Sequence, residues 1–177
     1  MTDAGLNGAL SERGVTRTQM NTFPDGLDNE FSPKSMPDGA GVFVPVLVTE
    51  AGKSLFESDN RAATIGGYVI KGLQRLEIKS SWGVREFLPK ETEQENVPLV
   101  FSLTMSGLVV QLSVHHPEME GDRDYYHMRG LKAYLISEPD QLEEFLLKLE
   151  TILIWAQGEF LTQVADQLSA VCRRGRL

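Results

Sequence analysis

The stretch that decides the fold is VFVPVLVTEAGK, residues 42–53. Its first eight residues, Val42–Thr49, are almost continuously apolar. That pattern is typical of a strand buried on both faces, so it predicts a central strand of a sheet. Pro45 cannot donate a hydrogen bond to a ladder, so a bulge or a locally unpaired position is expected there. The strand leads into a carboxylate, Glu50, and then an amine, Lys53.

A helix is predicted next, from Asn60 to about Lys79, with Ser58 or Asp59 as its N-cap. Its apolar residues recur at helical spacing: Ile65, Val69, Leu73 and Leu76. Its small residues would allow close approach to the sheet: Ala62, Ala63, Gly66 and Gly67. Lys71, Arg75 and Lys79 share one face of this helix. This basic face is either solvated or directed at phosphate groups.

The later part of the chain predicts a hairpin, a further strand and a long helix. The hairpin covers Val97–His115 and turns at Ser106-Gly107. An acidic loop, Pro117–Asp124, precedes a strand at Tyr125–Ile136 in which Gly130 marks a bulge. A helix capped by Ser137 then runs to near the C-terminus, and Gly158 is a point where it could divide. The resulting fold class is α+β, or three-layer α/β, with a mixed central sheet flanked by helices.

Length and composition set the domain organisation. The chain has 177 residues, which suits one domain over residues 42–177. Residues 1–41 lack an apolar period and predict a disordered N-terminal tail, in which Asp25, Asp28 and Glu30 are solvated. A single cysteine, no secretory signal and no membrane-spanning run predict an intracellular protein of the cytoplasm or nucleus, without a membrane partner. The net charge of −8 opposes non-specific nucleic-acid binding.

The acids around the first strand are candidate metal ligands. Asp38 precedes the strand and Glu50 follows it. Carboxylate oxygens are the ligands that Mg²⁺ prefers, and a bound ion would activate water and neutralise charge on a phosphate. Lys53 could then stabilise that charge. Two acids and a lysine are common, so this pattern alone is weak.

Several further short motifs follow one another along the chain. The helix start is Asp59-Asn60-Arg61-Ala62-Ala63, and the later segments are Val100-Phe101-Ser102-Leu103, His115-His116, Tyr125-Tyr126-His127-Met128, Glu138-Pro139-Asp140-Gln141-Leu142 and Ile154-Trp155. Together with Pro37-Asp38 and Glu50, this order resembles the PD-(D/E)XK nuclease-like domains found in many uncharacterised fungal proteins. The resemblance covers about two-thirds of the chain and implies a restriction-endonuclease-like core.

The resemblance implies a Mg²⁺- or Mn²⁺-dependent phosphodiester hydrolase acting on nucleic acid. Asp38 and Glu50 would bind metal and take part in catalysis with Lys53. Asn60, Lys71 and Arg75 would contact the substrate (Lys71 and Arg75 through the basic face). The chain departs from the pattern because Gly52 stands where the lysine is expected, and Lys53 comes one residue late. One step along a strand reverses the side chain, unless a bulge at Ala51-Gly52 restores its direction.

The expectation is therefore a degenerate nuclease-like domain, with activity uncertain. The alternative is a non-enzymatic protein-interaction module of the same fold, which would use its acidic surface and its long amphipathic C-terminal helix. His115, His116 and His127 could meet on neighbouring strands and bind zinc, although exposed or core-edge histidines are the plainer interpretation. Aromatic residues that could stack on bases are expected to be buried instead: Trp82, Trp155, Tyr125 and Tyr126.

Overall fold

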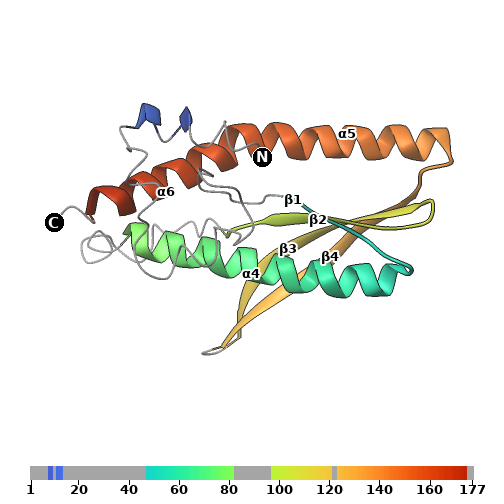
Figure 1. The fold of residues 1–177 in the computed structure, drawn as a ribbon, viewed down its shortest axis with the longest axis horizontal. Coiled ribbons are helices and arrows are strands. Elements are labelled where there is room, and N and C mark those ends of the chain that lie inside the picture. The colour runs from blue at the N-terminus through green and yellow to red at the C-terminus, as the bar shows by residue number, and fades with distance from the viewer. Residues whose placement is uncertain (1–7, 10, 14–46, 82–96, 121–122, 175–177) are drawn as a thin grey trace, which may run out of the picture. The chain divides into compact units, whose positions relative to one another are not determined.

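The computed structural model describes residues 8–9, 11–13, 47–81, 97–120 and 123–174 (Figure 1). Asp38, Pro45 and most of the predicted tail lie outside these residues. The chain divides into two compact units. One comprises Met1–Val44, Gly72–Val97 and Gln157–Leu177, and the other, here called the sheet unit, comprises Pro45–Lys71 and Pro98–Ala156. The single domain over residues 42–177 stays a prediction.

The sheet unit contains a four-stranded mixed sheet with strand order β1-β2-β3-β4. The strands are β1 (Leu47–Ala51), β2 (Val100–Ser106), β3 (Val109–Glu120) and β4 (Arg123–Leu135). β1 pairs with β2 in parallel, and the other pairs are antiparallel. The mixed sheet is as predicted, but the central position predicted for the first strand is wrong. Among the strands that the structure describes, β1 lies at one end of the sheet, and within it only Val48 is buried.

The β2–β3 hairpin turns one residue later than predicted. Ser106 pairs with Val109, so Gly107 and Leu108 form the two-residue loop. Gly107 has a φ of +59°, a conformation that favours glycine and suits such a tight turn. The hairpin itself is confirmed.

The predicted acidic loop is wrong in extent, because β3 continues to Glu120 and β4 begins at Arg123. Glu118 and Glu120 therefore lie in β3 and Asp124 lies in β4, where alternate residues face opposite sides. The bulge predicted near Gly130 is confirmed. Leu112 pairs with Lys132 and Ser113 with Gly130, which leaves one extra residue in β4.

The first long helix, α4 (Leu55–Ser81), begins five residues before the predicted start. Its cap is Ser54, whose Oγ accepts a hydrogen bond from the backbone N–H of Glu57 at 3.2 Å. Neither Ser58 nor Asp59 caps the helix, because both lie inside it. The start of the helix was predicted too late because Leu55 and Phe56, its first two residues, are equally compatible with the preceding turn.

The C-terminal helical segment comprises α5 (Pro139–Trp155), a π-helical turn (Ala156–Phe160) and α6 (Leu161–Arg174). The N-cap of α5 is Glu138 rather than Ser137, and it makes no side-chain capping hydrogen bond. Gly158 lies inside the π-helical turn, so the helical backbone changes its hydrogen-bonding pattern there instead of ending. No helix among the described residues is long and apolar enough to cross a membrane.

The two faces of the sheet differ in chemistry. α5 covers an apolar face, where Leu112, Tyr134 and Ile152 form the core cluster. The rings of Phe101 and Trp155 meet edge-on, with their centroids 5.7 Å apart. The ring centroids of Tyr134 and Phe145 are 5.5 Å apart. The first part of α4 covers the opposite face (Figure 1). This face is largely polar. The sheet unit therefore has the three layers that the element order predicted.

In the other unit, α6 holds one residue of the predicted N-terminal tail. Arg13 Nε lies 2.6 Å from Asp166 Oδ1. Arg173 Nη2 donates to the backbone oxygen of Arg13 at 3.3 Å. α6 buries apolar side chains that recur at helical spacing: Val164, Leu168 and Val171.

Candidate functional site

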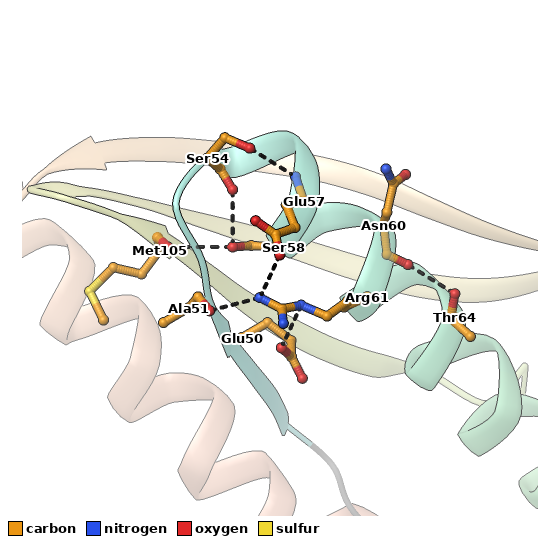
Figure 2. Close-up of polar contacts among 9 residues, drawn as sticks. All are labelled: Glu50, Ala51, Ser54, Glu57, Ser58, Asn60, Arg61, Thr64 and Met105. Carbon is orange, nitrogen blue, oxygen red and sulfur yellow. Dashed lines mark hydrogen bonds and ion pairs between the residues drawn. The ribbon is translucent and has the colours of Figure 1, made fainter.

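The candidate site lies where β1 ends and α4 begins (Figure 2). The register between β1 and β2 runs without a break from Leu47 to Ala51. Gly52 then extends the ladder, because its N–H donates to the backbone oxygen of Met105 at 3.1 Å. A Cβ at residue 52 would lie 2.6 Å from Ser58 Oγ and 3.1 Å from Arg61 Nη2. This turn therefore favours glycine at residue 52, where the PD-(D/E)XK pattern would have lysine.

Ser58 ties the start of α4 to the end of β2. Its side chain is fully buried, and its Oγ lies 3.2 Å from the backbone oxygen of Ser54 and 3.5 Å from that of Met105. One hydroxyl proton is shared between these two acceptors. The contact holds the helix against the strand and sets the position of Arg61, one turn further on.

Glu50, the predicted metal ligand, forms an ion pair with Arg61. Arg61 Nε lies 3.4 Å from Glu50 Oε2, and the side chain of Glu50 is 21% exposed. Arg61 Nη2 also donates to the backbone oxygen of Ala51 at 2.9 Å and lies 3.7 Å from Glu57 Oε1. Figure 2 shows the guanidinium between these three oxygen-bearing groups. The cation beside Glu50 is thus a side chain of the protein itself.

The other two predicted catalytic residues are not brought to Glu50 by the described contacts. Lys53 is exposed and lies beyond the end of β1, where its backbone oxygen accepts a hydrogen bond from Ser106 Oγ at 3.3 Å. The unbroken register up to Ala51 shows no bulge that would restore its direction. Asp38 lies outside the described residues.

The predicted substrate-binding residues are spread along α4. Asn60 is exposed, and its backbone oxygen accepts a hydrogen bond from Thr64 Oγ1 at 2.9 Å. Lys71 and Arg75 lie 10 and 14 residues after Arg61, or about 15 Å and about 21 Å along the helix axis.

Asp59 is a residue of the site that the sequence interpretation missed. Its carboxylate accepts hydrogen bonds from Thr104 Oγ1 at 2.6 Å and from Gln111 Nε2 at 3.3 Å. Thr104 and Gln111 are cross-strand partners, and Glu50 pairs with Thr104 on the other side. Glu50, Thr104 and Gln111 thus form one polar row across the sheet, with Asp59 above it.

A second buried polar group lies further along the same face. His115 Nε2 lies 2.8 Å from Ser102 Oγ, and both side chains are almost completely buried. Burial, aided by nearby His116, lowers the pKa of His115 from 6.5 to about 4. His115 is therefore neutral at pH 7. Because both side chains are buried, Ser102 is not open to a substrate.

Alternating polar residues in the sequence could have revealed this polar face. They occupy every second position of the hairpin strands, at the period of a strand: Ser102 and Thr104, then Gln111, Ser113 and His115. Ser113 Oγ is the one buried side-chain polar atom without a hydrogen-bond partner in the part of the chain that the structure describes.

The three histidines do not converge, so the zinc interpretation is wrong. His115 faces α4, whereas its neighbour His116 faces the opposite side, as successive strand residues must. His116 stacks on His127 with ring centroids 5.6 Å apart, and His127 Nε2 lies 3.3 Å from Glu118 Oε2. The described residues contain no group of three or more His, Cys, Asp or Glu that could hold a metal ion.

Comparison with known proteins gives one match. A model of the family described as "Domain of unknown function (DUF7924)" matches residues 8–168 of the chain. The match covers most of the chain and includes residues 8–41 of the region predicted as a tail. No curated protein and no solved structure matches.

Proposed function

This chain belongs to the DUF7924 family, and we propose that it is a nuclease-like binding domain in which Arg61 stands in place of a catalytic metal ion. The observation that carries the proposal is the ion pair between Arg61 and Glu50 at the end of β1. A mixed four-stranded sheet with a helix on each face is compatible with the PD-(D/E)XK-like core that the resemblance implies.

The surroundings of Glu50 do not fit a Mg²⁺ or Mn²⁺ ion. Mg²⁺ needs near-octahedral oxygen coordination, usually from one or two carboxylates plus water and phosphate. Here the guanidinium of Arg61 contacts the Glu50 carboxylate and the Ala51 carbonyl, two oxygens that would otherwise be available.

The turn after β1 also supports loss of catalysis. A lysine at residue 52 would place its Cβ 2.6 Å from the buried Ser58 hydroxyl, so the turn as folded has no room for it. Lys53 follows the strand rather than lying in it. The glycine and the arginine therefore belong to one arrangement that holds α4 on the sheet.

The test is a cleavage assay with the full chain on single- and double-stranded DNA and RNA. Mg²⁺, Mn²⁺ and a chelator are compared, and Glu50→Gln is run beside the wild type. The proposal predicts no metal-dependent cleavage above the level of Glu50→Gln. Metal-dependent cleavage by the wild type that Glu50→Gln abolishes would show a working hydrolase and overturn the proposal.

A further inference from the structure

The side of α5 that faces away from the sheet carries an unusual number of large apolar side chains. Phe145 and Ile152 face the core. Leu146, Leu147 and Ile154 are 52%, 57% and 65% exposed. Leu142 and Leu153 are exposed too. Single exposed apolar side chains are ordinary, but five large ones on one helix are typical of an interaction surface.

These five residues form one continuous band. At about 100° per residue, they fall within an arc of about 140° around the axis of α5. The band is here called the α5 band, and it comprises Leu142, Leu146, Leu147, Leu153 and Ile154. It borders the core-facing side of the helix, so the apolar surface of the sheet unit continues outward along α5.

Two carboxylates lie in the middle of the α5 band. Glu143 and Glu150 are both exposed and seven residues apart, so they share one line along the helix, separated by about 10 Å. Docking a second copy of α5 on this band would bring the two acidic lines together, which like charges disfavour. A partner that covers the leucines must instead offer positive charge at this spacing.

We propose that the α5 band binds an amphipathic helix of another protein, whose apolar stripe covers the leucines and whose Lys or Arg residues meet Glu143 and Glu150. Helix-in-groove recognition uses anchors at this kind of spacing, and paired charges fix partner choice and register. The net charge of −8 on the chain favours the same basic partner. The inference builds on the proposed function, which makes this a binding domain.

The probe is a synthetic helical peptide of about 21 residues with leucines at heptad a and d positions and lysines at the flanking e and g positions. The matched control peptide carries glutamates in place of the lysines. Binding to the full chain is measured by fluorescence anisotropy. We expect the lysine peptide to bind about fivefold to tenfold more tightly than its control, with a preference that shrinks as salt is raised.

Variants assign the binding to the α5 band. The double variant Glu143→Lys, Glu150→Lys should prefer the glutamate peptide to the lysine peptide. The double variant Leu147→Ser, Ile154→Ser should bind neither. Lys148→Ala is the matched control, because Lys148 is exposed on α5 outside the band and should leave binding unchanged. All these positions are exposed, and unchanged thermal unfolding confirms that each variant is folded.

Equal binding of the two peptides, or no binding of either, would overturn the proposal. So would self-association of the wild type that Leu147→Ser with Ile154→Ser removes, since a second copy would then cover the band. The cleavage assay fails or succeeds independently of these results. A working hydrolase would sink the proposed function and leave the peptide result standing, whereas absent peptide binding would leave the Glu50–Arg61 pair untouched.

Discussion

Gly66 and His115 show how single residues set the approach of α4 to the sheet. A Cβ on Gly66 would lie 2.3 Å from His115 Nδ1, closer than real Cβ atoms come. The ring cannot move aside freely, because it is buried and lies 2.8 Å from Ser102 Oγ. The absence of a side chain at residue 66 therefore allows helix and strand to meet.

Gly66→Ala should destabilise the protein by about 2 kcal/mol, although alanine favours a helix by about 1 kcal/mol over glycine. Urea unfolding measures the change. Gly67→Ala is the matched control, because its Cβ would meet Tyr126 Cβ at an ordinary 3.6 Å. The control should be neutral or stabilising. Equal effects of the two substitutions would mean that α4 does not lie this close to His115.

His115 predicts a loss of stability in acid. Its pKa is about 4 when folded and about 6.5 when unfolded, so the unfolded chain binds the proton more readily. The contribution is complete above pH 6.5 and is lost as the pH falls to 4. The difference between the folded and unfolded pKa values of His115 corresponds to about 3 kcal/mol in the free energy of unfolding.

Denaturant unfolding at a series of pH values measures this loss. His115→Gln should flatten the pH dependence between pH 4 and 6.5, whereas His127→Gln, at an exposed position, should keep it. An unchanged slope in His115→Gln would show that other groups cause the acid sensitivity.

Among the elements, α5 has an N-terminus that is only partly satisfied. Its N-cap, Glu138, has φ −91° and ψ 116°, the extended conformation of a capping residue, but makes no side-chain capping hydrogen bond. Ser or Asp at this position should accept a bond from an N–H of the first turn. The backbone of Glu138 therefore has the conformation of an N-cap, but its side chain accepts no hydrogen bond from the first turn of α5.

Glu138→Ser should stabilise the protein by about 1 kcal/mol, the usual contribution of an N-cap side chain. The midpoint of thermal unfolding should rise accordingly. Ser137→Ala is the control and should have little effect, since Ser137 is not the cap. A loss of stability from Ser137→Ala larger than any gain from Glu138→Ser would place the cap one residue earlier, as the sequence pattern predicted.

Periodicity predicted the existence of the main elements, but not their ends or their position in the sheet. The alternation in β2 and β3 and the helical spacing in α4 were strong signals, and the hairpin and helices follow them. β3 ran past its predicted end because Glu118 and Glu120 read as loop residues, although a strand exposed on one face accepts them. The first strand looked central because the residues before Leu47 are apolar too.

The candidate site was harder to predict than the fold. Glu50 was singled out because it follows an apolar run, but it lies inside β1, next to the last residue of the strand. Its partner could not be foreseen, because Arg61 reaches back across a turn whose shape depends on Gly52 and Ser58. Asp59 was assigned to a cap, while its partners Thr104 and Gln111 lie 45 and 52 residues away. Such contacts depend on how the helix lies on the sheet.

For the whole molecule, the central claim is that Arg61 occupies the place of a metal ion beside Glu50. Binding of Mn²⁺ to the full chain tests it directly, because electron paramagnetic resonance distinguishes free from bound Mn²⁺. Wild type and Glu50→Gln are titrated under the same conditions. The account predicts that the two bind the same amount of Mn²⁺. One Mn²⁺ bound by the wild type and lost in Glu50→Gln would contradict it.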